Sequence, residues 1–210
     1  MGSRSRFALL FVAAVVVVMA FAVPALASTV KSGSSNMTVS PAVTHTLVGA
    51  RISIEPVAPV TEVTKWNKAG AMYWWFRLPM KSGGTWNATT GAGKFYHDGS
   101  LRFVNTSTSP QKVFRAEGVQ IIATSTNSYS LSVTYPTAAY VNLPGTNYAR
   151  VTLATSTHAP AITHSGKSYK IDGVQFKLTT AGRDAINSVI GVVLPTNVIL
   201  FDTNILPVLQ

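Results

Sequence analysis

Apolar and polar side chains alternate along several short segments of the chain after residue 50. In the clearest segment, Leu131, Val133 and Tyr135 alternate with Ser and Thr side chains. Neighbouring side chains of a strand point to opposite faces, so this spacing places one set in a core and the other in water. The same spacing recurs elsewhere together with enrichment in Val, Thr and Tyr, which favours strands. The predicted strands are residues 51–57, 72–78, 94–96, 100–105, 112–117, 119–124, 130–135, 139–143, 150–153, 169–172, 174–178 and 197–202.

Clusters of Gly, Pro, Asn and Ser separate these segments, which is typical of short strands joined by tight connections. The number of strands predicts a mainly β fold, an antiparallel β-sandwich or a flattened barrel. Residues 180–191 have helical spacing instead, with Thr180 as a candidate N-cap and Gly191 as a natural stop. We therefore expect one short helix near residues 180–190, covering an open end of the sandwich.

The first 27 residues have the three-part pattern of a secretory signal peptide. Arg4 and Arg6 lie in a short basic start, residues 7–23 form an unbroken apolar run, and residues 25–27 read Ala-Leu-Ala. The alternative is a retained membrane anchor, although the apolar run is at the short end for a membrane span. Removal of this segment predicts a bacterial protein that is secreted, extracellular or associated with the cell wall.

The rest of the chain divides into a leader and one domain. Residues 28–48 are rich in Ser and Thr and carry few large side chains, which predicts a flexible leader. Residues 49–210 have a length that suits a single β domain. They contain no second apolar run long enough to span a membrane, so no transmembrane span is expected after signal cleavage.

The chain has 210 residues, with 17 Lys and Arg, 7 Asp and Glu, and no Cys. The absence of Cys excludes thiol catalysis, disulfide scaffolds, cysteine zinc sites and iron–sulfur clusters. Signal cleavage removes two arginines and lowers the formal charge from +10 to +8. A basic exported protein is expected to attract anionic cell-envelope polymers, lipid headgroups or a carboxylated ligand rather than nucleic acid. The alternative is a soluble surface that is basic without a corresponding partner.

His97 and an aromatic run are the first candidates for a ligand site. His97 precedes a tight-turn Asp-Gly pair, so its imidazole is expected at a strand end, where it can touch a ligand or simply be solvated. In residues 72–77, alternation points Tyr73 and Trp75 to one face, which can cover a flat ligand or pack under a loop. No histidine spacing typical of a metal site occurs, so no metal ligand is predicted.

Cations near these residues can meet the carboxylates of a flat anionic ligand, and Tyr96 adds a further ring. The predicted ligand-binding set is His97, Tyr73, Trp75, Tyr96, Arg77, Lys94 and Arg102. No Gly-x-Ser-x-Gly elbow, Walker loop or dinucleotide fingerprint occurs, so no catalytic residue is assigned and no enzyme is predicted. The enzymatic alternative is a secreted hydrolase that uses an unrecognised Ser/His pair.

The segment 91–103, with its Tyr-His-Asp-Gly-Ser-Leu core, resembles the Gly-His-x-Gly-x-Leu strand–turn–strand of HtaA-type domains. The order of the surrounding motifs is also similar, with residues 76–84 upstream, 149–153 midway and 171–179 leading into the Thr/Ala-rich helix. Over residues 76–202 the chain thus resembles the secreted actinobacterial HtaA-like proteins, which include haem-binding surface proteins.

This resemblance implies a β-rich sandwich with short helices. For haem-binding members it also implies a tyrosine as iron ligand, a histidine that hydrogen-bonds the tyrosine, and aromatic rings beside the porphyrin. His97 falls on the histidine of that motif. The family's tyrosine follows a Trp-Gly…Ser-Phe…Tyr segment that this chain lacks, and Tyr73 or Tyr96 is the substitute.

Three functions follow from these observations. The first is an exported, non-catalytic binding protein of HtaA-like type that interacts with cell-envelope polymers. The second is a protein that binds a small flat ligand, either haem, the one candidate cofactor, or another flat anion. The third is the secreted hydrolase.

Overall fold

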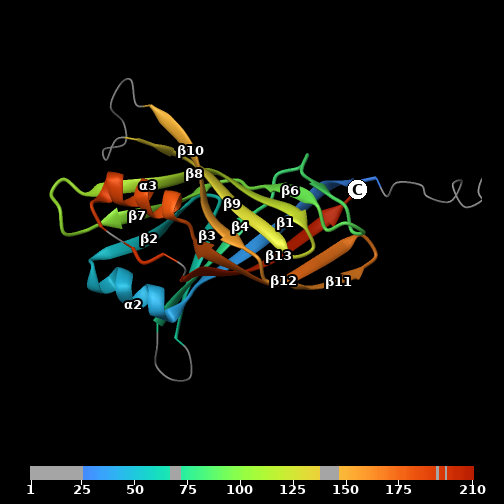
Figure 1. Ribbon diagram of the computed structural model, residues 1–210, viewed down its shortest axis with the longest axis horizontal. Coiled ribbons are helices and arrows are strands. Elements are labelled where there is room, and N and C mark those ends of the chain that lie inside the picture. Colours follow the sequence, from blue (N-terminus) through green and yellow to red (C-terminus); the bar gives the residue numbers. More distant parts are fainter. Residues whose placement is uncertain (1–25, 67–71, 138–146, 193, 197) are drawn as a thin grey trace, which may run out of the picture.

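Strands form most of the computed structural model, which describes residues 26–66, 72–137, 147–192, 194–196 and 198–210 (Figure 1). The strands are β1 (Ser28–Val39), β2 (Ile52–Val57), β3 (Thr61–Trp66), β4 (Met72–Pro79), β5 (Thr85–Trp86), β6 (Gly93–Tyr96), β7 (Ser100–Asn105), β8 (Lys112–Ser125), β9 (Ser128–Pro136), β10 (Tyr148–Ser156), β11 (Ala161–Ser165), β12 (Ser168–Leu178) and β13 (Ile199–Leu209). The helices are α2 (Pro41–Gly49) and α3 (Thr180–Ile190).

Antiparallel pairings join eight of the described strands into a closed ring. The order around the ring is β1, β13, β12, β10, β9, β8, β6, β5 and back to β1. The other strands extend it: β4 and β3 follow from β1, β11 from β12, and β7 and β2 from β8. This arrangement confirms the predicted mainly β fold of the sandwich or flattened-barrel kind.

The inward faces of the strands build one hydrophobic core. Its largest completely buried side chains include Trp86, Phe76, Phe95, Phe103, Phe114, Phe176, Phe201, Met37, Leu47, Ile54 and Leu78. Burial of one such side chain contributes about 1.5–3 kcal/mol, so the core holds the strands firmly in register. Figure 1 shows both helices at one end of the long axis, with the start of β1 and the end of β13 at the other.

The predicted helix is confirmed as α3, with a shifted first turn. Its N-cap is Thr179 rather than Thr180, because the Thr179 hydroxyl accepts a hydrogen bond from the Gly182 amide at 2.9 Å. Gly191 ends the helix in the left-handed region, with φ of 74°. The buried face of α3, which includes Ile186, packs against the core.

The predicted flexible leader is wrong, because residues 28–48 hold strand β1 and most of helix α2. β1 pairs with β13 along one edge and with β4 and β5 along the other. Met37 is completely buried in this strand, and so is Ser35. Serines at inward positions hide the apolar alternation that marks a strand, so composition alone suggests a loop. The domain therefore begins at Ser28, and α2 is a second helix.

Two pairs of strands that the sequence predicts as separate are each a single strand, with a glycine at the predicted break. Residues 112–124 lie in one strand, β8, in which Gly118 has φ of 51° and sits in a register shift opposite β9. Residues 169–178 lie in one strand, β12, in which Gly173 has φ of 80° and sits in a register shift opposite β13. Both glycines are in β-bulges, which tolerate a positive φ, rather than in turns.

Some elements have no counterpart among the predicted strands. β3, β5 and β11 are additional, and β13 continues to Leu209 instead of ending at residue 202. The predicted strand 139–143 lies outside the described residues, as does the predicted signal peptide apart from its last two residues. In the described part of the chain, no helix combines the length and apolar character needed to cross a membrane.

Candidate functional site

His97 is buried in the interior, whereas the sequence predicts a strand-end imidazole that is open to a ligand or to water. Only 3% of its surface is exposed. Its Nε2 lies 2.8 Å from the Ser35 hydroxyl, and its Nδ1 lies 3.4 Å from the carbonyl oxygen of Val119. Nδ1–H therefore donates to Val119, and Nε2 accepts from Ser35. Both ring nitrogens have protein partners, so the expected exposure of the ring is wrong, and the role of His97 in touching a ligand stays a prediction.

The environment of His97 also keeps the ring neutral. Burial lowers its pKa from 6.5 to about 4, and this effect outweighs the opposing contributions of the Val119 carbonyl and the Asp98 charge. A neutral ring matches the tautomer that these hydrogen bonds require. His97 thus joins β1, the end of β6 and β8 as an internal polar contact.

Ser35 and His97 have the contact of a nucleophile and its base, as the hydrolase alternative requires. However, Ser35 has no exposed surface, so no substrate can reach its hydroxyl. The group that orients the imidazole is the carbonyl of Val119 rather than a carboxylate. The pair is therefore built as a structural contact.

The other predicted ligand residues are spread over three strands. Tyr73, Trp75 and Arg77 lie on the outward face of β4, opposite the buried side chains of Trp74 and Phe76, as alternation predicts. Tyr73 is seven residues from Met80, which pairs with His97, a separation of about 23 Å along the strand. Tyr73 and His97 are therefore not brought together.

The remaining members of the predicted set lie on other strands. Tyr96 is partly exposed and Lys94 is exposed, both on the outward face of β6. Arg102 on β7 donates through Nη2 to the Glu55 carboxylate on β2 at 2.6 Å. Because Arg102 already pairs with a carboxylate, it is not a free partner for a ligand's carboxylate.

A different set of residues gathers on the outward face of β12, β13, β1 and β4. One row follows directly from the pairing registers: Gln175 lies opposite Asp202, Asp202 opposite Thr38, and Thr38 opposite Trp75. These four residues are exposed or partly exposed. Neighbouring strands are about 4.8 Å apart, so the row spans roughly 14 Å.

A second row lies beside the first. Asn36 lies opposite Asn204 on one side and opposite Arg77 on the other. The bulge of β12 places Asp172 next to Asn204, whose side-chain oxygen accepts from the Gly173 amide at 3.2 Å. We call the two rows the outer grid, which consists of Gln175, Asp202, Thr38, Trp75, Asp172, Asn204, Asn36 and Arg77.

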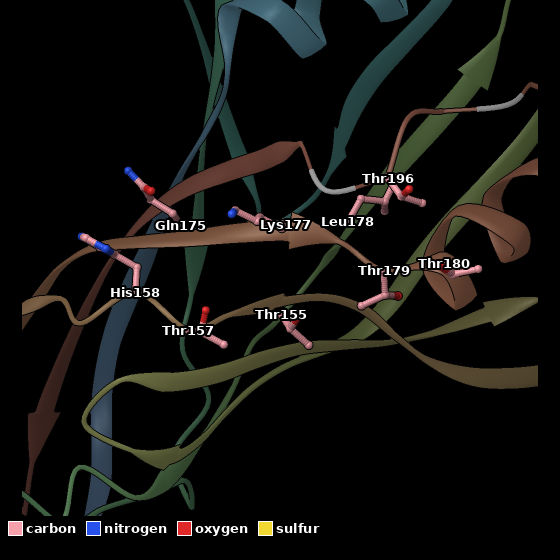
Figure 2. A pocket seen from close by; sticks show the side chains of 9 residues that line it. All are labelled: Thr155, Thr157, His158, Gln175, Lys177, Leu178, Thr179, Thr180 and Thr196. Atoms are coloured by element: carbon pink, nitrogen blue, oxygen red, sulfur yellow. The ribbon is translucent and has the colours of Figure 1, made fainter.

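Two hollows open beside the outer grid. One, of about 420 Å³, is lined by Thr38, Ala161, Asp172, Gly173, Asp202 and Asn204. The other, of about 470 Å³, is lined by Thr155, Thr157, His158, Gln175, Lys177, Leu178, Thr179, Thr180 and Thr196. Figure 2 shows the second hollow between β12 and the end of β10, where the two strands diverge. Because Gln175 and Asp202 are cross-strand partners, the two hollows are neighbours.

The outer grid carries little net charge although the chain is basic. Lys170 forms an ion pair with Asp172 at 2.7 Å. Asp202 takes part in no ion pair with the described residues. The same part of the chain contains no group of three or more His, Asp or Glu that could hold a metal ion. The grid can offer amides, one hydroxyl, carboxylates, one guanidinium and one indole to a ligand.

The sequence pattern identifies Trp75 and Arg77 of this grid but misses the other six residues. Asp202 and Asn204 occupy outward positions of an alternating strand, which is a signal that any exposed strand shares. Only the strand registers, which join residues far apart in the chain, reveal that these polar side chains are neighbours.

Comparisons with protein-family models, curated proteins and solved structures find no match to this chain. The resemblance to HtaA-type domains therefore stays a prediction.

Proposed function

We propose that the protein is an exported, non-catalytic binding module that holds a polymer of the bacterial cell envelope. The observation that carries this proposal is the outer grid, in which two rows of polar side chains and an indole lie beside two hollows. Closely hydrogen-bonded strands hold these groups in place, so binding a long ligand requires little reordering of the protein. Export rests on the signal pattern of the first 27 residues.

The overall positive charge supports the same function in a different way. A formal charge of +8 on the exported chain attracts the protein to an anionic envelope over longer distances than any contact. Salt screens such attraction, whereas hydrogen bonds and stacking in the outer grid respond far less to ionic strength. The charge would thus accelerate encounter, and the grid would supply the lasting contacts.

The buried contacts of His97 weigh against the alternatives. A hydrolase that used the Ser35–His97 pair would need access to Ser35, which is fully buried. A haem site of the kind that the resemblance implies would need His97 beside a tyrosine hydroxyl, whereas its ring nitrogens contact Ser35 and Val119. Haem binding would then depend on the other accessible residues of the predicted set, which are Tyr73, Trp75, Tyr96, Arg77 and Lys94.

Cosedimentation of the purified exported chain with insoluble bacterial envelope material tests the proposal. We expect retention at low salt and a substantial bound fraction at 1 M salt, where charge attraction is almost fully screened. Loss of all retention at every ionic strength would contradict the proposal. A parallel titration with hemin tests the alternative, since a Soret shift that persists in Asp202→Asn and disappears in Tyr73→Phe would favour haem instead.

A further inference from the structure

We infer that the outer grid binds a neutral, β-1,4-linked polysaccharide, with Trp75 as a stacking surface and the amide and carboxylate side chains as hydrogen-bonding partners for sugar hydroxyls. This inference rests on the proposed function, because it names the class of polymer that the same site takes.

The shape of the grid favours an extended, flat chain. Its first row crosses four strands in continuous register, from Gln175 to Trp75. The strand spacing is close to the width of a pyranose ring, so successive strands can present one group to each part of a sugar chain. A β-1,4-linked polysaccharide is flat and extended, whereas α-linked chains coil away from a flat surface.

The chemistry of the grid favours hydroxyl groups. Gln175 carries both a donor and an acceptor, and Thr38 carries a hydroxyl that can do either. Asn204 and Asn36 offer their amide N–H groups, because the Asn204 side-chain oxygen accepts from Gly173 and the Asn36 side-chain oxygen is buried. Asp202 accepts hydrogen bonds strongly from hydroxyl groups because it is charged. Such side chains can pair with sugar hydroxyls, which themselves both donate and accept.

Trp75 supplies the apolar half of this recognition. Its indole lies at the β4 end of the first row and is partly exposed on the outward face. Tyr73 lies on the same face two residues earlier, also partly exposed. The C–H face of a pyranose ring is apolar and packs on aromatic rings, and buried aromatic contacts often dominate binding.

The charge of the grid argues against a polyanion. Asp172 and Asp202 are its acids, and Arg77 is its one cation among these eight residues. Asp202 has no basic partner among the described residues, so an approaching phosphate or carboxylate chain would meet an uncompensated negative charge. Arg77 lies in the grid, and Lys170 and Lys177 lie beside it, but none of them forms an ion pair with Asp202.

Binding of the exported chain to insoluble chitin and cellulose, compared with binding to polygalacturonate, tests this inference. We expect retention on at least one of the two neutral polymers, with affinity reduced about tenfold or more by Trp75→Ala and by Asp202→Asn. Tyr148→Ala is the matched control, since Tyr148 is 55% exposed and lies on β10, outside the grid. The control should bind like the unmodified protein.

Asp202→Asn keeps the inference testable if Trp75→Ala unfolds the chain, because it changes one exposed side chain with almost no change in shape. Retention on envelope material that is unchanged in both grid variants, or that is competed only by polygalacturonate, would overturn the inference and leave the proposed function intact. Absence of retention on envelope material and on both neutral polymers would overturn the proposed function and the inference together.

Discussion

Two polar clusters of this protein, one around His97 and one on the outer grid, lie in opposite settings. In the first, the buried His97 ring accepts from the Ser35 hydroxyl and donates to the Val119 carbonyl. In the second, amides, carboxylates and an indole lie in register on a face that water reaches. The comparison teaches that residue type alone does not identify a ligand site, because accessibility decides whether a polar group serves the fold or a partner.

The largest expected effect is the loss of stability in His97→Ala. This change removes the imidazole partner of the buried Ser35 hydroxyl and opens a cavity, whereas the Val119 carbonyl still accepts from the backbone amide of residue 97. We expect the free energy of unfolding to fall by about 2–4 kcal/mol, measured by chemical denaturation. His158→Ala is the control, because His158 is exposed and should change stability by less than about 0.5 kcal/mol. Equal effects of the two variants would show that the buried cluster is not structural.

The buried His97 should also make the stability of the protein depend on pH. The pKa of His97 is lowered by burial to about 4 in the folded protein, against 6.5 for a free imidazole, so the unfolded chain binds a proton first on acidification. The stabilising contribution is full above pH 6.5 and is lost as the pH falls from 6.5 toward 4, on the order of 3 kcal/mol. His97→Gln removes this titration, so its stability should change less over that range. Denaturation midpoints measured from pH 4 to pH 7 check this, and identical slopes in both proteins would refute it.

A smaller loss of stability is expected from substitution of Gly173 in the β12 bulge. Its effect on binding distinguishes a role in the grid from a general role in the fold. Gly173 has φ of 80° and no neighbouring atom within 4 Å of an added Cβ, so Gly173→Ala should cost about 1 kcal/mol from backbone strain alone. Gly118→Ala, in the β8 bulge with φ of 51°, should cost about as much. Polysaccharide binding should weaken only in Gly173→Ala, since Gly173 positions Asp172 and contacts Asn204. Equal weakening in both variants would indicate a general loss of order.

The smallest expected change in stability belongs to the grid itself. Asp202 is exposed and has no ion-pair partner among the described residues, so Asp202→Asn should alter the free energy of unfolding by less than about 0.5 kcal/mol. Thermal unfolding measures this directly. A clear loss of stability would mean that Asp202 serves the fold, as His97 does, and would weaken the contrast between the two clusters.

The sequence predicts those helices and strands that are marked by a pattern within a few neighbouring residues. It misses those whose place depends on pairing with distant strands. Helix α3 and strand β7 depend on spacing within a few residues, and both are predicted well. Strand β1 is missed because Ser34 and Ser35 occupy buried positions, where apolar residues usually reveal a strand. Its neighbours in the sheet, β4 and β13, are also distant in the chain, so local pattern could not reveal its place.

The candidate site is harder to predict for the same reason. The burial of His97 depends on Ser35, 62 residues away, and no pattern near His97 indicates that contact. The outer grid joins Thr38 to Asp202 through a strand register that the sequence does not show. Trp75 was accessible to prediction because alternation within one strand separates it from Trp74 and Phe76.

The most direct test of the central claim, that the outer grid rather than the His97 cluster meets the ligand, is chemical-shift mapping with a soluble chito- or cello-oligosaccharide. We predict that the largest shifts belong to the Trp75 indole N–H and to the side-chain amides of Asn36, Asn204 and Gln175, with His97 unaffected. Shifts centred on His97 and Tyr96, with the grid amides unchanged, would contradict the claim.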